Sequence, residues 1–354
     1  MNQKRNCKLT VILSITVLLL AVALLISLTV NTLKNVHKAP GSCVTLPVII
    51  AHHAGQGDWP SNTVYAVKQA EKKGVKVINI TLELSKDGIP FAFHGFDLAR
   101  FTDGKGNPED MTMTELRKLD AGYRFQEKGK YIYRGKGIRI PALTDILKAT
   151  DLQLILDIKT SRFKTLIDSL RKIVADKDWD RLVFYSTDSS AVKYLMKSCP
   201  RAKVFQKRDN TRFLLLDYQM NGRLSMNSGW NWDWVGFEGE RAFKVSESFT
   251  LGTAVSTIKD TRLWSRCLVE AVKRSFPDCK MVVFNVSTEE EYLRAACNGV
   301  YGIYTDYPLR LLQFRQKVAK SAYTGTGLLS MFCKSPSCQN AKIFQRKLIF
   351  LNCM

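Results

Sequence analysis

The feature that most constrains the fold is a regular alternation of short apolar runs with helix-like segments between residues 46 and 314. Segments such as 63–74 and 162–177 carry apolar residues at helical spacing. Strands that alternate with helices form parallel βαβ units, and eight such units close an α/β fold of the (β/α)8, TIM-type barrel class. Nine runs compete for the eight places, so one is expected to be misread or extra: 46–53, 75–84, 89–95, 152–159, 181–186, 202–206, 233–238, 280–286 and 299–306.

An apolar segment near the N-terminus predicts a membrane anchor. Residues 10–30 are uncharged, and about 20 apolar residues suffice to cross a bilayer as a helix. The segment is long for the apolar part of a cleaved signal peptide, and no small-x-small cleavage site follows it. We therefore expect a single-pass protein whose barrel faces the periplasm, the exterior or a lumen, with these parts: cytoplasmic residues 1–9, membrane helix 10–30, linker 31–47, barrel 48–314 and basic tail 315–354.

The charge balance indicates anionic partners. The chain has 53 Lys and Arg against 32 Asp and Glu, which gives a formal net charge of +21. Such an excess favours phosphate groups, acidic lipid headgroups or nucleic acid, although a merely solvated basic surface is equally compatible with it. Because the basic residues are scattered and form no nucleic-acid motif, we expect an anionic membrane surface and no nucleic acid as partner.

The nine cysteines do not predict a metal site. No CxxC pair occurs, and no Cys/His cluster has zinc-ligand spacing. Cys333 and Cys338 in CKSPSC could close a small disulfide if the domain lies in an oxidising compartment.

Polar side chains gather where several predicted strands end, which is the end of a (β/α)8 barrel that carries chemistry. Two of these strand ends carry histidines that could act together on a phosphodiester. One histidine would take a proton from the attacking hydroxyl while the other protonates the leaving alkoxide. A lysine or a divalent cation would then offset the charge on the phosphate oxygens. The candidate residues are His52, His53, Asn79, Thr81, Glu83, His94, Asp157 and Lys159.

An ordered set of motifs resembles the glycerophosphodiester phosphodiesterase family over residues 48–314. The chain reads HHAG at 52–55, PSNT at 60–63, NIT at 79–81, SKDGIP at 85–90, HGFDLARFTDGKG at 94–106, LDAG at 119–122, IPAL at 140–143, DIK at 157–159 and YTDYP at 304–308. The resemblance implies a phosphoric diester hydrolase acting on glycerophosphodiesters or lysophospholipid-type substrates. It implies that His52 and His94 are the catalytic pair, and that His53 and Lys159 contact the substrate phosphate.

The chain departs from the family's pattern at the positions that bind metal. Asn79 and Thr81 stand where the family has a glutamate and an aspartate, and Asp157 is a shortened version of a third acid. Ser61 and Gly95 replace two further acids. Because Mg²⁺ and Ca²⁺ are hard cations held by anionic oxygens, we expect this site to bind either ion weakly or not at all.

Three interpretations of these departures stay open. Glu83, two residues along the same face, could restore a metal ligand. Alternatively His53, Lys159 or Lys76 could supply the positive charge without a metal. Finally, the barrel could be a catalytically impaired relative that binds a phospholipid headgroup or a protein.

Overall fold

The structure, a computed structural model, describes residues 45–224, 230, 232–249, 252–323 and 333. The described residues belong to one compact unit that begins at Thr45. The predicted cytoplasmic segment, the predicted membrane helix 10–30 and all but the last three residues of the predicted linker lie outside the described residues. In the ranges that are described, no helix is both long and apolar enough to span a bilayer.

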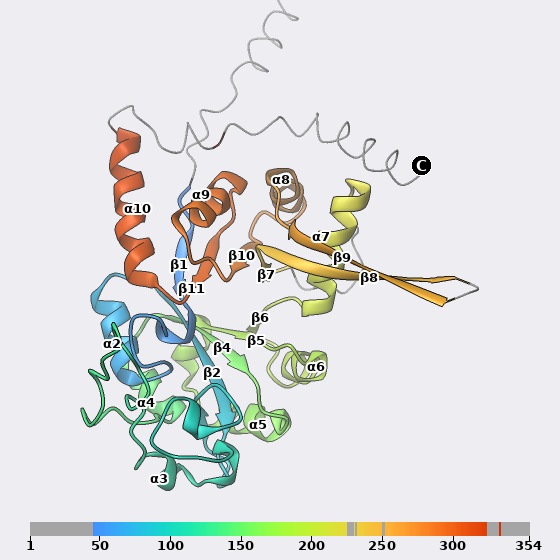
Figure 1. Cartoon of the computed structure of the whole chain (residues 1–354). Coiled ribbons are helices and arrows are strands. Elements are labelled where there is room, and N and C mark those ends of the chain that lie inside the picture. Colours follow the sequence, from blue (N-terminus) through green and yellow to red (C-terminus); the bar gives the residue numbers. More distant parts are fainter. Residues whose placement is uncertain (1–44, 225–229, 231, 250–251, 324–332, 334–354) are drawn as a thin grey trace, which may run out of the picture. The chain divides into compact units, whose positions relative to one another are not determined.

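Eight parallel strands form a nearly closed barrel (Figure 1), which confirms the predicted fold class. The strands follow the order β6-β5-β4-β2-β1-β11-β10-β7, and one parallel bridge between Phe205 and Trp234 joins the two outer strands. Strands covered on both faces need continuous apolar runs, which is why these segments could be recognised in the sequence. The strands are β1 (Val48–Ala51), β2 (Val77–Leu84), β4 (Gln153–Ile158), β5 (Leu182–Tyr185), β6 (Lys203–Val204), β7 (Trp234–Glu238), β10 (Lys280–Phe284) and β11 (Gly302–Thr305).

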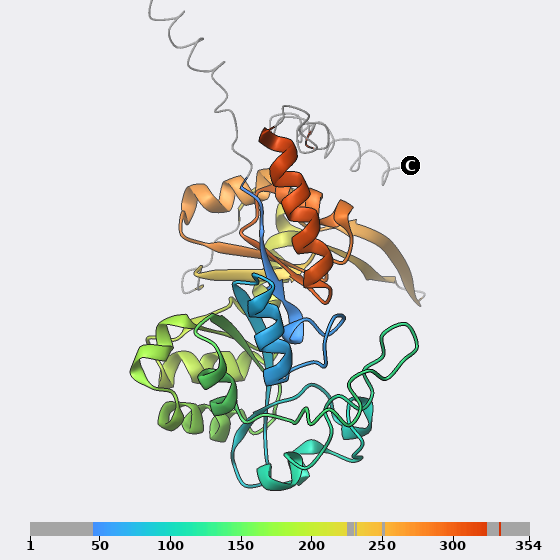
Figure 2. The ribbon, with the colours of Figure 1, turned by 90° about the vertical axis from the view of Figure 1, so that its left-hand side faces the viewer.

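Helices cover the outer face of the barrel, and Figure 2 shows α2 and α10 on the outer side of β1. Helix α5 illustrates why, because Leu166, Ile167 and Leu170 are buried in one stripe while Arg171 and Lys172 are exposed. The helices are α2 (Val64–Lys72), α3 (Met113–Leu116), α4 (Leu143–Ala149), α5 (Phe163–Ile173), α6 (Ser189–Ser198), α7 (Arg208–Asn221), α8 (Arg266–Ser275), α9 (Glu289–Asn298) and α10 (Pro308–Tyr323). Helix α10 continues through residue 314, where the sequence places the end of the barrel.

The ninth predicted strand is not part of the barrel wall. Strand β3 (Pro90–Ala92) pairs antiparallel with the end of β2, so that Leu84 lies opposite Pro90. The turn between them uses Gly88 at φ +79°, a left-handed conformation that favours glycine. The expectation that His94 ends a barrel strand is therefore wrong, because His94 follows an antiparallel return strand and approaches the rim from an insertion.

A two-stranded hairpin between β7 and α8 was not expected from the sequence. Strands β8 (Glu240–Phe249) and β9 (Gly252–Arg262) pair only with each other, and Figure 1 shows them extending away from the barrel. Their sequence has at most two apolar residues in a row, placed among serines, threonines and charged residues. A strand that is not packed into a core does not require the apolar run by which the barrel strands were recognised.

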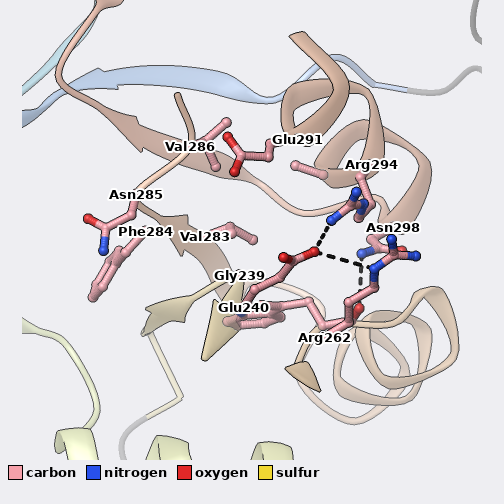
Figure 3. A pocket seen from close by; sticks show the side chains of 12 residues that line it. Gly239, Glu240, Arg262, Val283, Phe284, Asn285, Val286, Glu291, Arg294 and Asn298 are labelled. Carbon is pink, nitrogen blue, oxygen red and sulfur yellow. Dashed lines mark hydrogen bonds and ion pairs between the residues drawn. The ribbon is translucent and has the colours of Figure 1, made fainter. Parts of the chain in front are cut away.

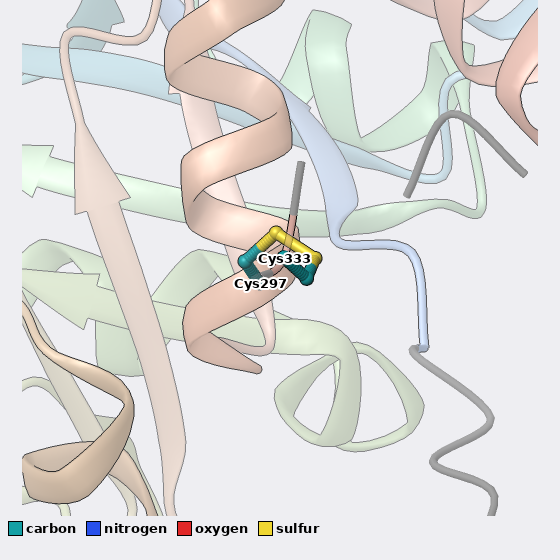
Figure 4. The surroundings of a disulfide bond; sticks show 2 residues. All are labelled: Cys297 and Cys333. Atoms are coloured by element: carbon teal, nitrogen blue, oxygen red, sulfur yellow. A yellow bond between two sulfur atoms is a disulfide. The ribbon is translucent and has the colours of Figure 1, made fainter. Parts of the chain in front are cut away.

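The disulfides differ from the sequence expectation. Cys333 bonds to Cys297 at the end of α9, with a Cα–Cα distance of 5.2 Å (Figure 4). The predicted pair of Cys333 with Cys338 is therefore wrong, because the fold brings a distant helix end within reach of Cys333. Cys267 in α8 is also disulfide-bonded, whereas Cys199 and Cys279 are free and buried.

Candidate active site

The first catalytic candidate, His52, lies directly against an acid. Strands β1 and β11 pair in register, with Ala51 opposite Thr305, so the next residues on each strand leave the barrel side by side. Nδ1 of His52 lies 2.7 Å from Oδ1 of Asp306. Burial alone would raise the pKa of Asp306, but hydrogen bonds from His52 and Gln56 hold it below its ordinary value. A carboxylate in this position fixes the imidazole and leaves Nε2 free for a substrate.

His53 lies between the two catalytic candidates. Its ring centroid is 3.7 Å from that of His52 and 4.4 Å from that of His94. The backbone of His53 is left-handed, at φ 49° and ψ 39°, and its N–H donates to Oδ1 of Asn79 at 3.2 Å. Burial, together with the positive charges that His52 and His94 can carry, holds the pKa of His53 well below its ordinary value. His53 is therefore neutral at pH 7, which weakens the interpretation that it supplies positive charge in place of a metal.

His94 also favours its neutral form in this structure. Burial, followed by the charges of Lys159 and Arg100, lowers the pKa of His94 to about 4. Its Nδ1 atom is buried, and no described residue forms a hydrogen bond with it. The neighbouring Gly95 has φ +123°, a conformation that disfavours the aspartate found there in the family. An anion bound beside His94 would shift it toward the protonated form.

The wall formed by β2 and β4 has lost most of its negative charge. The side chain of Asn79 is already occupied, because Oδ1 accepts from His53 and Nδ2 donates to the carbonyl of Ile155 at 3.1 Å. Thr81 and Asp157 are register partners on neighbouring strands. Oγ1 of Thr81 and Oδ1 of Asp157 are both buried, and within the described part of the chain neither forms a hydrogen bond. Two unpaired oxygens therefore face the site.

Lys159 stands beside the one acid that remains. Its Nζ lies 3.2 Å from Oδ2 of Asp157. Burial raises the pKa of Asp157 above its ordinary value, while the ammonium of Lys159 acts in the opposite direction. The strand thus carries an ion pair at a position where the family resemblance implies a metal ligand.

Glu83 lies farther along β2 and is buried. Burial, followed by the charges of Glu109 and Asp157, raises the pKa of Glu83 to about 8, and Lys159 opposes this only in part. At neutral pH the carboxyl group is therefore mostly protonated, a form in which it is a poor ligand for a hard cation.

These residues do not fit a divalent cation site of the kind that the resemblance implies. Asn79 is engaged in structural hydrogen bonds, Glu83 holds its proton, and Asp157 is paired with an ammonium group. No group of three or more His, Cys, Asp or Glu in the described residues is arranged to hold a metal ion. Hard cations need several anionic or strongly polar oxygens, and the wall offers one ionisable acid that is already neutralised.

Sequence reasoning missed two residues of the rim. Asp306 lies in the YTDYP motif at 304–308 and was given no role in catalysis, yet it contacts His52. Arg208, at the start of α7, donates to the hydroxyl of Tyr185 at 3.3 Å, pairs with Glu238 and acts electrostatically on Asp157. No sequence signal distinguishes Arg208 from the other scattered basic residues. The contact between His52 and Asp306 exists only because β1 lies beside β11.

A separate cavity of about 100 Å³ lies beyond the ends of β7 and β10 (Figure 3). Its polar side is closed by Glu240, which pairs with Arg262 at 3.3 Å and with Arg294. None of the predicted site residues lines it. The rim that carries the histidines is therefore the better candidate for the active site.

The chain is similar to known proteins over most of the barrel. The profile described as the Glycerophosphoryl diester phosphodiesterase family matches residues 52–310. An uncharacterised protein of Mycobacterium tuberculosis is 32% identical over 274 residues, which cover 76% of this chain and 90% of that protein. The crystal structure of a glycerophosphoryl diester phosphodiesterase domain from M. tuberculosis has a TM-score of 0.70 at 31% identity and covers 77% of this chain and 100% of that chain.

A more distant structure shares the fold. A phosphodiesterase of Oleispira antarctica, solved in complex with its product sn-glycerol-3-phosphate, has a TM-score of 0.55 at 21% identity. The match covers 77% of this chain and 97% of that chain.

Proposed function

Because the chain belongs to the glycerophosphoryl diester phosphodiesterase family, we propose that it hydrolyses glycerophosphodiesters or lysophospholipid-type diesters with His52 and His94 as the proton-transferring pair. The observation that carries this proposal is the 2.7 Å contact between His52 and Asp306, which orients one histidine at the rim. The other histidine approaches the same rim from the insertion after β3, with the ring of His53 between them.

The proton transfers follow from these positions. Nε2 of His52 takes the proton of a water molecule as its oxygen attacks phosphorus, and the carboxylate of Asp306 stabilises the imidazolium that forms. The bond from phosphorus to the leaving oxygen breaks, and His94 gives its proton to that oxygen. His94 can act as the acid because the bound phosphodiester anion raises its pKa above the low value of the free site. The products are an alcohol and a phosphomonoester.

The charge on the phosphate oxygens is offset by side chains in this proposal. Lys159 lies beside Asp157, and Arg208 contributes a second permanent positive charge nearby. Ammonium and guanidinium groups can stabilise developing phosphate charge without a metal. We therefore propose that activity does not require a divalent cation.

One observation favours a second candidate function, which is binding of an anionic headgroup without turnover. The ring of His53 occupies the space between His52 and His94, so the reacting phosphate must lie across the edges of the rings. If a phosphate in that position does not react, Lys159 and the basic surface would still bind an anionic headgroup.

Hydrolysis of glycerophosphocholine and lysophosphatidylcholine by the purified full chain separates the two functions. We expect phosphomonoester release that persists in EDTA and is lost in His52→Ala and His94→Ala. His37→Ala, in the predicted linker, is the control and should leave the rate unchanged. Activity that survives both site substitutions would contradict the histidine mechanism, and loss in EDTA would contradict the metal-independent form. Substrate binding with no release in the parent chain would favour the binding function.

We also propose that the barrel is extracytoplasmic and tethered by residues 10–30. The uncharged segment supports an anchor, and the bond between Cys297 and Cys333 supports an oxidising compartment. Protease added to the extracytoplasmic face of the membrane that holds the chain, in vesicles of known orientation, should cleave the barrel. Cleavage only when protease reaches the opposite face would place the barrel in the cytoplasm.

A further inference from the structure

The segment from Tyr123 to Arg139, here called the basic loop, is a strongly charged and exposed part of the described barrel. It lies between α3 and α4 and contains six basic residues and one acidic residue, Glu127. All six basic residues are exposed: Arg124, Lys128, Lys130, Arg134, Lys136 and Arg139. Figure 2 shows the loop, in green, projecting from the rest of the domain.

The basic loop is held in a defined conformation. The guanidinium of Arg134 stacks over the rings of Tyr123 at 4.0 Å and Tyr131 at 3.8 Å, and its Nε donates to the carbonyl of Tyr123 at 3.2 Å. The ring of Tyr133 lies 5.2 Å from those of Phe125 and Tyr65. These contacts hold the backbone of the loop in place, so its lysines have defined positions. The lysines of a flexible basic tail would not.

The loop lies near the rim that carries the histidines. Its anchor point, Tyr65, is in the first turn of α2, and α2 begins soon after η1 (His52–Ala54). The basic surface continues into a groove between the loop, α2 and α4. The charged residues that line this groove are Lys68, Arg117, Lys136, Arg139 and one acid, Asp145, which pairs with Arg117 at 2.7 Å.

Two large side chains are exposed beside the turn of the loop, which Lys128 and Gly129 form between the bridged residues Glu127 and Lys130. Tyr131 is 39% exposed and Ile132 is 37% exposed, and they follow directly after Lys130. Exposed large apolar side chains within a ring of cations are typical of surfaces that enter the headgroup region of a bilayer, where lysines meet lipid phosphates and aromatic rings lie at the interface.

We propose that the basic loop docks the barrel on an anionic lipid surface, with Tyr131 and Ile132 entering the headgroup layer. The charge of the loop complements an acidic membrane, and the exposed Tyr131 and Ile132 beside its turn would have no role in binding to a purely polar polyanion. The disulfides favour a lipid surface over nucleic acid, because an oxidising compartment is not where nucleic acid is bound. The inference does not depend on catalysis, since docking would occur whether or not the site turns over.

Hydrogen exchange of the loop in the full chain tests this inference directly. The chain is incubated with phosphatidylcholine vesicles with or without phosphatidylserine, and the amides of residues 123–139 are followed. We expect slower exchange only when phosphatidylserine is present, and loss of the protection at about 1 M salt, where the Debye length falls to about 3 Å. Equal exchange with both vesicle types would overturn the proposal.

A matched pair of triple variants shows whether the protection belongs to the loop. K128Q/K130Q/K136Q removes three exposed lysines that form no ion pair or side-chain hydrogen bond with any described residue. K164Q/K172Q/K177Q removes the same charge from exposed positions in and after α5. We expect protection to be lost only in the first variant. Equal loss in both, or protection by a single-stranded RNA and not by phosphatidylserine, would overturn the proposal.

Discussion

The two sides of the barrel rim have kept different parts of the family's chemistry. On the side of β1 and β11, His52 and Asp306 form a close contact that orients a proton acceptor. On the side of β2 and β4, Asn79 and Thr81 are neutral, and the one remaining acid, Asp157, is paired with Lys159. In the proposed mechanism, orientation of the proton acceptor and compensation of the phosphate charge therefore depend on different strands.

The difference also has an energetic side. An ion pair between a lysine and a buried aspartate is costly to desolvate, and it is tolerated only while both partners are present. The contact between His52 and Asp306 lies at the partly exposed rim, so its desolvation costs less folding free energy. The β2–β4 side should therefore respond to substitution through stability as well as rate, and the β1–β11 side mainly through rate.

The largest effect is expected on the β1–β11 side. His52→Ala should lower kcat about a thousandfold and Asp306→Asn about a hundredfold, because they remove the proton acceptor and its orientation respectively. Steady-state kinetics with glycerophosphocholine should show little change in KM for Asp306→Asn. Asp151→Asn, at an exposed position, is the control for loss of one carboxylate. A drop in kcat no larger for Asp306→Asn than for the control would remove the distinction between the two sides.

The next effect concerns the ion pair on β4. Lys159→Met should destabilise the fold by about 3 kcal/mol, because it leaves Asp157 buried without a counter-charge. The double substitution Lys159→Met with Asp157→Leu should recover most of that loss, since it removes both charges. Urea unfolding of the two variants measures the difference. A double variant less stable than the single one would show that Asp157 has another partner.

A third effect is a pH dependence of folding stability that arises from Glu83, on the β2–β4 side. The pKa of Glu83 is raised to about 8 in the folded state, against 4.5 ordinarily, so the folded state binds the additional proton between these values. Stability from Glu83 is therefore present at low pH and lost as pH rises toward 8. Between pH 6.5 and 8 the loss should be about 2 kcal/mol. Urea unfolding should show this slope in the parent chain, and Glu83→Gln should flatten it. A slope of the same size in Glu83→Gln would assign it to another group.

The range above pH 6.5 is used because the opposing contribution of His94 is small there. The pKa of His94 is lowered to about 4 in the folded state, so its contribution to stability is lost as pH falls below its ordinary value of 6.5. Glu83 and His94 act in opposite directions between these values.

Several barrel strands could be predicted because burial on both faces leaves a continuous apolar run, as in residues 48–51 and 182–185. Strand β3 has the same apolar character, and only the direction of its pairing with β2 shows that it lies outside the barrel wall. The β8–β9 hairpin could not be found in this way, because it does not contribute to the barrel. The pattern of apolar residues shows which segments are buried. It does not show the direction of a strand, which has to be inferred from the lengths of the connections between strands.

The candidate site could be predicted as a set of residues that the fold brings together, but the charge states of those residues could not. His52, His94, Asp157 and Lys159 follow from motifs, and the structure places them at one rim. The neutral state of His53 and the proton held by Glu83 follow from burial and from neighbours distant in the sequence. The partner of His52 is 254 residues away, so the contact with Asp306 depends on the pairing of β1 with β11.

The smallest effect tests whether the lost metal site can be restored. Thr81 and Asp157 are register partners with unpaired oxygens, so Thr81→Asp would place a second carboxylate beside the first. Two acids should bind Ca²⁺ where one does not, and Ca²⁺ at ten times its Kd would stabilise the folded state by about 1.4 kcal/mol. The rise of the unfolding midpoint with Ca²⁺ measures this. Thr81→Asn is the control, because asparagine has nearly the same shape as aspartate but carries no charge. If Ca²⁺ raises the unfolding midpoint of Thr81→Asn as much as that of Thr81→Asp, the missing negative charge on the β2–β4 side does not explain the loss of metal binding.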